Sequence, residues 1–283
     1  MDLKRIFQTA NPILGVVHLL PLPTSPRWGG SMQAAIERAE REATALAAGG
    51  VDGILVENFF DAPFTKGAVD PAVVSAMTYI VERLMNLVTL PMGINVLRND
   101  ARSAMAIATI VGAQFIRTNV LTGVMATDQG LIEGCAYELL RYRREIGSDV
   151  KILADVLVKH ARPLGSPNLT VAVRDTIERG LADAVVLSGW ATGSPPDLED
   201  LELAKAAADG VPVFIGSGAT WENVATLLTA ADGVIVASSL KRHGCRDRTI
   251  DPTRVRQFVE AARNLPPGKG TTAAIADLKL RST

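Results

Sequence analysis

Ionisable side chains stand inside otherwise apolar stretches of this chain, where they could carry out acid–base chemistry. Glu57, Asp155 and Lys159 combine two carboxylates with an amine, and such groups exchange protons when neighbouring charges tune them. We predict these three as catalytic residues, with one carboxylate available as base. A second set of polar residues is predicted to bind and orient a ligand beside them: His18, Asn95, Arg117, Asn119 and His160.

The same charges also permit a purely structural interpretation. Two carboxylates and two cations can form a self-neutralising cluster in the interior, because buried charges usually pair for structural reasons. The histidines have a structural alternative as well. With three in the chain and ambiguous carboxylate neighbours, they do not predict a metal site, and no residue pattern identifies a cofactor.

Small residues follow two late apolar stretches and form the strongest local motif. Gly216, Ser217 and Gly218 follow one stretch, and Ser238 and Ser239 end the next. Small side chains let backbone N–H groups approach an anion, and a helix N-terminus adds favourable partial charge. We therefore predict that these five residues bind phosphate or sulfate, with tight glycine turns as the alternative.

The elements that would position these residues are short β-branched runs that alternate with helical patterns. Each run is mostly continuous in apolar residues, as a strand covered on both faces should be. The expected strands are residues 13–19, 52–59, 92–98, 114–120, 150–158, 182–188, 211–215 and 233–238. Alternation of this kind is typical of βαβ units with a parallel sheet inside and helices outside.

Helix start signals fall in the gaps between these runs. Ser31 precedes an Ala-rich stretch that runs to Ala48, and Thr220 can cap residues 221–229. Asp70-Pro71 and Asp251-Pro252 each read as an N-cap followed by proline at the first helical position. These signals predict helices between the strands.

Eight β/α units in about 250 residues are what a closed (β/α)8 TIM barrel requires. We predict an α/β fold with one barrel domain over residues 1–265, followed by a loosely ordered tail over residues 266–283. A doubly wound open sheet is the alternative, but the first turn lacks the dinucleotide-binding glycine fingerprint. In a barrel the carboxyl ends of the strands hold the chemistry, and the candidate residues fall there.

Composition excludes several classes of protein. Of 283 residues 48% are hydrophobic, and 29 basic against 30 acidic side chains leave a net charge of -1. Such a chain has neither the composition of a disordered protein nor the broad basic field of a nucleic-acid-binding one, so no nucleic-acid partner is expected. Cys135 and Cys245 are too few for a disulfide framework, and no run approaches the roughly 18 apolar residues of a spanning helix. A reducing cytosol fits best.

Three loops leave their roles open. Residues 20–30 are rich in proline and residues 59–67 in aromatic side chains, which suits a lid, a docking surface, packing on a helix or a homo-oligomer contact. Residues 241–248 form a basic loop, either solvated or facing an anion. With no lipidation motif, any membrane attachment should be peripheral, through this loop or a protein partner.

Several long motifs, in order along the chain, resemble the BtpA family. The similarity covers about residues 5–265, and its motifs occupy residues 15–23, 25–30, 56–64, 93–100, 155–161 and 188–193. Residues 121–130 look like the cyanobacterial branch. The resemblance implies a photosystem I biogenesis factor that helps reaction-centre proteins accumulate. It also implies a cytoplasmic protein attached peripherally to the thylakoid surface, with photosystem I assembly components as partners.

The wider family suggests a second class of function. It includes proteins labelled as nucleosidase or sugar-metabolism candidates, and the expected barrel resembles the ribulose-phosphate-binding superfamily. The alternative is therefore an enzyme acting on a phosphorylated or ribosyl-like small molecule. Costly internal polar groups at the barrel mouth favour a real ligand site under either interpretation, and the sequence leaves open whether catalysis occurs.

Overall fold

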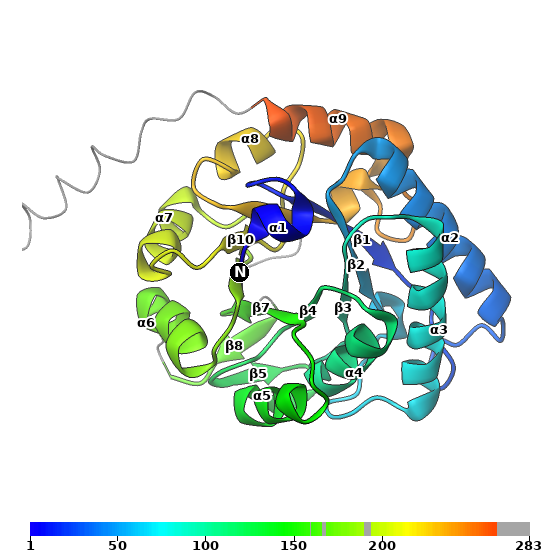
Figure 1. The fold of residues 1–283 in the computed structure, drawn as a ribbon, viewed down its shortest axis with the longest axis horizontal. Helices are drawn as coiled ribbons and strands as arrows, with labels where there is room; N and C mark the ends of the chain where they lie inside the picture. The colour runs from blue at the N-terminus through cyan, green and yellow to red at the C-terminus, as the bar shows by residue number, and fades with distance from the viewer. Residues whose placement is uncertain (159, 166–167, 190–193, 265–283) are drawn as a thin grey trace, which may run out of the picture.

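The eight predicted strands all form and pair in parallel into a closed barrel, seen end-on in Figure 1. The computed structural model describes residues 1–264 except 159, 166–167 and 190–193. Around the barrel the strands are β1 (Ile13–His18), β2 (Gly53–Glu57), β3 (Met92–Asn95), β4 (Phe115–Thr118), β7 (Lys151–Val156), β9 (Ala184–Leu187), β10 (Val213–Ile215) and β11 (Gly233–Val236). Pairing of β11 with β1 closes the ring and rules out the open sheet.

Helices surround the barrel in the expected alternation (Figure 1). They are α2 (Met32–Gly49), α3 (Pro71–Leu87), α4 (Ala101–Val111), α5 (Ala136–Glu145), α6 (Leu169–Arg174), α7 (Leu198–Ala207), α8 (Val224–Leu227) and α9 (Pro252–Arg263). Ser31 Oγ accepts the Ala34 N–H and begins α2, while Asp70 and Asp251 begin α3 and α9 as predicted.

One predicted helix, over residues 221–229, is wrong in extent. The helix there is the single turn α8, which begins at Val224 and ends at Leu227. Asn223 Oδ1 accepts the Thr220 N–H at 2.8 Å, and this side-chain contact closes a turn that delays the helix start. The prediction of Thr220 as the capping residue is therefore wrong.

A short helix, α1 (Leu3–Phe7), closes the amino end of the barrel. Phe7 meets Phe115 edge to face, with ring centroids 5.7 Å apart. Around them lies an apolar interior layer from six strands: Leu14, Val16, Leu55, Leu153, Val186, Phe214 and Ile235. Gly93 leaves room for Phe115, because a Cβ there would clash with its ring. This end of the barrel is therefore a packed core.

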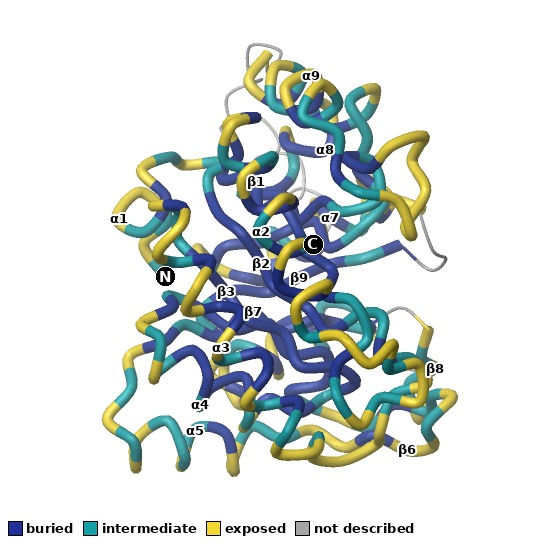
Figure 2. The backbone as a smooth tube through the Cα atoms, turned by 90° about the vertical axis from the view of Figure 1, so that its right-hand side faces the viewer, coloured by how far each residue is buried: buried dark blue, intermediate teal, exposed yellow. Residues whose placement is uncertain are grey.

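The opposite end carries a small antiparallel sheet that the sequence patterns did not predict. Its strands β5 (Val124–Thr127), β6 (Gly130–Glu133) and β8 (Ala161–Pro163) pair in the order β6-β5-β8. In Figure 2, α1 and the β6–β8 region lie at opposite ends of the molecule. The sheet packs on the loops after β4 and β7 through Val120 and Val158, and so helps to shape the barrel mouth.

Among the described helices, none has the length and apolar character needed to cross a bilayer. The predicted C-terminal tail, residues 266–283, lies outside the described residues.

Candidate functional site

The inward face of the barrel changes from apolar to charged within two residues on three strands. Strand β2 presents Leu55 and then Glu57 at its carboxyl end, and β7 presents Leu153 and then Asp155. Strand β4 does the same with Phe115 and Arg117. Because side chains alternate across a strand, residues two apart share a face. The strand pattern thus places two carboxylates and a guanidinium together in one layer.

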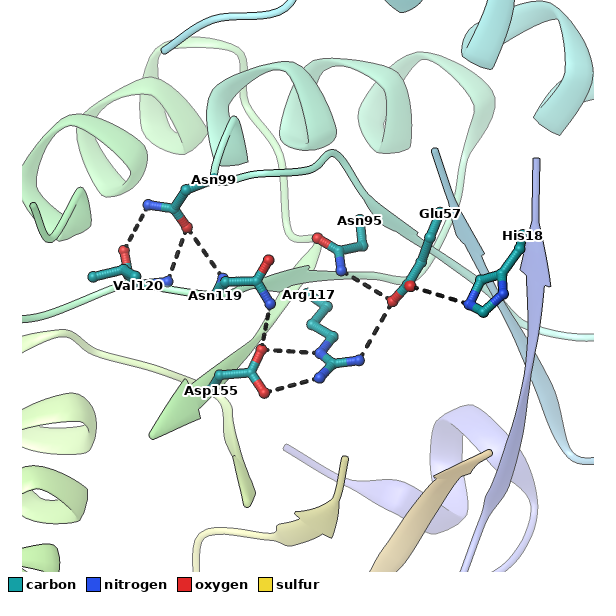
Figure 3. Close-up of polar contacts among 8 residues, drawn as sticks. All are labelled: His18, Glu57, Asn95, Asn99, Arg117, Asn119, Val120 and Asp155. Carbon is teal, nitrogen blue, oxygen red and sulfur yellow. Dashed lines mark hydrogen bonds and ion pairs between the residues drawn. The ribbon is translucent and has the colours of Figure 1, made fainter. Parts of the chain in front are cut away.

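Arg117 joins the two carboxylates in that layer (Figure 3). Its Nε and Nη2 donate to the two oxygens of Asp155 at 3.0 and 2.9 Å, and its Nη1 donates to Glu57 Oε1 at 3.3 Å. All three residues are buried. The bidentate geometry is the strong form of an arginine–carboxylate contact.

Three more predicted residues complete this layer. Asn95 Nδ2 donates to Glu57 Oε1 at 3.0 Å, and Asn119 Nδ2 donates to Asp155 Oδ2 at 2.6 Å. His18 Nε2 lies 3.6 Å from Glu57 Oε2, with its ring stacked on a neighbouring phenylalanine. We call these six residues the floor cluster: His18, Glu57, Asn95, Arg117, Asn119 and Asp155.

Asn99, in the loop after β3, fixes the backbone on which Asn119 stands. Its Oδ1 accepts the N–H groups of Asn119 and Val120 at 3.1 and 2.8 Å, and its Nδ2 donates to the Val120 carbonyl at 3.0 Å. These contacts replace ladder hydrogen bonds beyond the end of β4 (Figure 3). Asn99 therefore positions Asn119 without belonging to the floor cluster.

Electrostatics hold Glu57 and Arg117 of the floor cluster in their charged forms. Burial by itself would raise the pKa of Glu57, but the hydrogen bond with His18, the charge of Arg117 and the Asn95 amide lower the pKa to about 2. Burial likewise lowers the pKa of Arg117, and the charges of Asp155 and Glu57 overcome that effect and raise it. Glu57 is therefore a carboxylate at neutral pH, and a very weak base.

A cavity of about 1300 Å³ opens above the floor cluster. It is lined by five members of the cluster, by His160 and by all five residues of the predicted anion loops; the last five are Gly216, Ser217, Gly218, Ser238 and Ser239. Phe59, Phe60 and Phe64 from the aromatic loop form part of its wall. Of the residues predicted to act here, Lys159 lies outside the described residues. The others line this cavity, except Asp155, which is hydrogen-bonded to the lining residues Arg117 and Asn119.

The two glycines of the first anion loop have packing requirements of their own. A Cβ on Gly216 would lie 2.5 Å from Ser188 Oγ and 3.2 Å from Arg117 Nη2. Gly218 has a φ of 78°, and a Cβ there would clash with the backbone of Ser194 and Pro195. Close packing of the loops after β9 and β10 thus requires these glycines, which is the tight-turn alternative, and anion binding needs support from other groups.

Two arginines that line the cavity, Arg254 and Arg98, were not among the predicted site residues. Arg254 in α9 donates from Nε to the Ser239 carbonyl at 2.9 Å, and its guanidinium lies 4.6 Å from the Trp221 ring centroid. The Asp251-Pro252 helix start after the last strand was the signal that could have found Arg254. The other residue, Arg98, is buried after β3 and lines the cavity. Burial lowers its pKa, whereas the charges of Asp155 and Asp128 raise it.

Comparison with known proteins identifies the family. Residues 9–264 match the model of the BtpA family. The chain belongs to the BtpA family. It is 73% identical over 277 residues to photosystem I biogenesis protein BtpA of Synechocystis sp., covering 98% of this chain and 96% of that protein. It is also 46% identical over 265 residues to an uncharacterized protein of Thermococcus kodakarensis, covering 94% and 98%.

Solved structures show that the BtpA-family fold is shared with TIM-barrel enzymes. N-(5'-phosphoribosyl)anthranilate isomerase from Pyrococcus furiosus matches with a TM-score of 0.54, covering 90% of this chain and all of that one. The two sequences are 16% identical, so the match concerns the fold alone. It confirms the predicted (β/α)8 barrel.

The basic loop of this BtpA-family chain differs from its prediction at one residue. Lys241 is fully buried, with Nζ 3.6 Å from Glu42 Oε1 in α2, whereas residues 242–248 are exposed. The backbone of Lys241 pairs with Ile250, which turns its side chain toward the helix layer. Interpreting all eight residues as one exposed loop was therefore wrong for Lys241. Arg246 and Asp247 lie at the cavity rim.

Proposed function

We propose that this chain is a photosystem I biogenesis factor that promotes the accumulation of reaction-centre proteins. The observation that carries this proposal is the 73% identity to the Synechocystis biogenesis protein along 98% of the chain. That similarity extends over every barrel strand and over both loops at the mouth. A partner among photosystem I assembly components belongs to the same proposal.

The barrel mouth supplies a ligand site for this factor. Six buried polar side chains make up a floor cluster beneath a wide cavity, and burying that many polar groups costs stability that packing alone would not require. Within this proposal Glu57 is a carboxylate that contacts His18 and Arg117, and Asp155 orients Arg117 through two hydrogen bonds. Lys159 and His160 keep their predicted roles in proton transfer and ligand binding, and the loops at residues 216–218 and 238–239 hold an anion.

Attachment to the cytoplasmic face of the thylakoid membrane is peripheral in this proposal. The exposed segment 242–248 carries Arg242, Arg246 and Arg248. Each basic residue near an anionic surface contributes about 1 kcal/mol, which salt screens within about 8 Å. A salt wash should therefore release much of the protein from isolated membranes, and retention after both salt and alkaline washes would contradict peripheral attachment.

Complementation tests the main function. A Synechocystis strain that lacks its BtpA protein would express this chain, and photosystem I content would be measured from the light-induced absorbance change of the reaction-centre chlorophyll. We expect restored photosystem I content with photosystem II unchanged. A folded chain that accumulates to the native level and restores nothing would overturn the proposal.

A second candidate function is enzymatic action on a phosphorylated or ribosyl-like small molecule. The observation that favours it is the charged floor cluster at the carboxyl end of the strands, where TIM-barrel enzymes perform their chemistry. Mass spectrometry of small molecules that copurify with the native protein tests it. Conversion of a copurified molecule by the purified chain would support catalysis, and recovery of the molecule unchanged would favour a binding role.

A further inference from the structure

Arg254 is a cation that the fold holds rigidly at the cavity wall. It is the third residue of the twelve-residue helix α9, and it is half-buried between the Ser239 carbonyl and the Trp221 ring. No carboxylate among the described residues lies within ion-pair distance of it. Guanidinium groups stay charged at any physiological pH and offer planar donors that match phosphate oxygens. Arg254 therefore presents an uncompensated charge to the cavity.

A second donor, Ser217, lines the same cavity as this arginine. Ser217 lines the cavity next to Gly218, and its Oγ is buried with no hydrogen-bond partner in the described part of the chain. A buried hydroxyl without a partner loses free energy that a bound acceptor would restore. Ser217 and Arg254 together form a donor-rich rim, which suits a dianionic group.

The floor of the cavity offers a hydrogen-bond acceptor, whereas the rim offers donors. Asn119 is 4% exposed, and its Nδ2 is committed to Asp155, which fixes the amide because a carboxylate only accepts. Its Oδ1 points away from Asp155 in Figure 3 and has no hydrogen-bond partner among the described residues. Such an acceptor requires a donor such as a hydroxyl group. The cavity thus has donors at its rim and an unsatisfied acceptor at its floor.

Rim and floor line one and the same cavity. The position of a Cβ on Gly216 lies 3.2 Å from Arg117 Nη2, so the loop that carries Ser217 touches the floor cluster directly. A single ligand in this cavity can therefore meet both sets of groups.

We propose that the cavity binds a phosphate monoester of a small polyol or sugar in one orientation, with its phosphate on Arg254 and Ser217 and a hydroxyl donating to Asn119 Oδ1. The inference rests on the ligand site of the proposed function and adds its substrate class and anchors. Trp221 orients the guanidinium by stacking, and the neutral Asn119 selects for the hydroxyl-bearing end.

Calorimetric titration of the purified full chain tests this orientation. Glycerol 3-phosphate and ribose 5-phosphate would be compared with n-propyl phosphate, which keeps the ester and lacks hydroxyls, and with glycerol, which lacks the phosphate. We expect at least one of the two hydroxylated esters to bind about tenfold more tightly than n-propyl phosphate, and glycerol not to bind. Failure of both hydroxylated esters to bind, or equal affinity of all three esters, would overturn the proposal.

Variants of Arg254 and Asn119 test which residue binds each end of the ligand. Arg254→Gln should weaken binding of every ester by at least about tenfold, because it removes a charge-assisted contact. Arg256→Gln is the matched control, since Arg256 is exposed on the same helix and contacts Thr253 instead of the cavity. Asn119→Leu should reduce the hydroxylated esters to the affinity of n-propyl phosphate. If that variant fails to fold, the comparison among esters on the unaltered chain still decides the floor contact.

The same variants separate this inference from the proposed function. If the chain restores photosystem I in cells but binds none of the esters, the inference fails and the biogenesis function stands. If it binds the esters as expected but restores nothing, the biogenesis function fails and the ligand class stands.

Discussion

Two groups of buried charges in this molecule behave in opposite ways. The floor cluster places Glu57 against Arg117, Asn95 and His18, all within 3.6 Å, and both Glu57 oxygens have a partner. The second group, which we call the helix-layer pair, is Glu42 and Lys241. Their closest atoms are 3.6 Å apart, and Glu42 Oε2 and Lys241 Nζ make no hydrogen bond to any described residue.

Their pKa values differ accordingly. Glu57 has a pKa lowered to about 2, although it is buried. Burial raises the pKa of Glu42 despite the nearby charges of Lys241 and Arg38, and burial lowers the pKa of Lys241 despite Glu42. Burial thus favours neutral forms in both places, and at Glu57 dense hydrogen bonding together with the charge of Arg117 reverses it. Glu57 and Arg117 of the floor cluster are thus held in their charged forms, whereas the helix-layer pair gains little from its charge.

The largest effect should come from removing the cation of the floor cluster. Arg117→Met leaves Glu57 and Asp155 buried without their shared partner, which should lower the free energy of unfolding by about 3–5 kcal/mol. Urea denaturation at pH 7 measures the loss. Arg143→Met is a matched control, because Arg143 pairs with Asp183 at 3.2 Å in a partly exposed site where about 1 kcal/mol or less is expected. Equal losses in the two variants would show that the floor charges are not specially dependent on Arg117.

Lowering the pH should change the contributions of Glu57 and Glu42 to the free energy of unfolding in opposite directions. The folded pKa of Glu57 is below its unfolded value of 4.5, so its contribution is present above pH 4.5 and is lost as the pH falls toward 2. A shift of that size corresponds to about 3 kcal/mol in total. The raised pKa of Glu42 has the opposite effect, since the folded state takes up that proton first and gains stability as the pH falls toward 4.5.

The urea concentration at the midpoint of unfolding, followed from pH 7 to pH 3, measures both contributions. Glu57→Gln should flatten the decline below pH 4.5 relative to the unaltered chain. Glu42→Gln should leave that decline intact and remove the gain at milder acidity. Parallel curves for the Glu57→Gln variant and the unaltered chain would contradict the assignment of the acid limb to Glu57.

The barrel and most of the floor cluster could be predicted because both follow from strand periodicity. An arginine or carboxylate inside an apolar run must face either the barrel interior or the helix layer, and at a strand's carboxyl end the interior is the mouth. That reasoning correctly brought Glu57, Arg117 and Asp155 together. It could not show that Arg117 bonds both carboxylates and so holds Glu57 in its charged form, because that depends on distances between three strands.

Elements without a strong period were missed. Helix α1 has five residues, two of them basic, and its burial depends on Phe7 reaching Phe115 across the barrel. The β5–β6 hairpin turns at Asp128-Gln129, which lacks the glycine that marks common two-residue turns. The Asp251-Pro252 helix start places Arg254 in the first turn of a helix after the last strand, but no local pattern shows that it lines the cavity or that Lys241 is buried.

The smallest effect should come from neutralising the helix-layer pair. In the double variant Glu42→Gln, Lys241→Met, the new amide carbonyl at position 42 can still accept from Arg38 Nε, which now donates to Glu42 at 3.2 Å, and the methionine fills the space of the lysine stem. Replacing a buried ion pair by neutral groups of similar volume is often neutral or stabilising, so urea denaturation at pH 7 should place this variant within about 1 kcal/mol of the unaltered chain. The loop after β11 should also keep its position, because Arg38 Nη2 holds it independently through the carbonyls of Asp247 and Arg248 at 3.0 and 3.2 Å. A loss as large as that of Arg117→Met would mean that the pair is as necessary as the floor cluster. The difference in hydrogen bonding between the two groups would then have no effect on how much each contributes to stability.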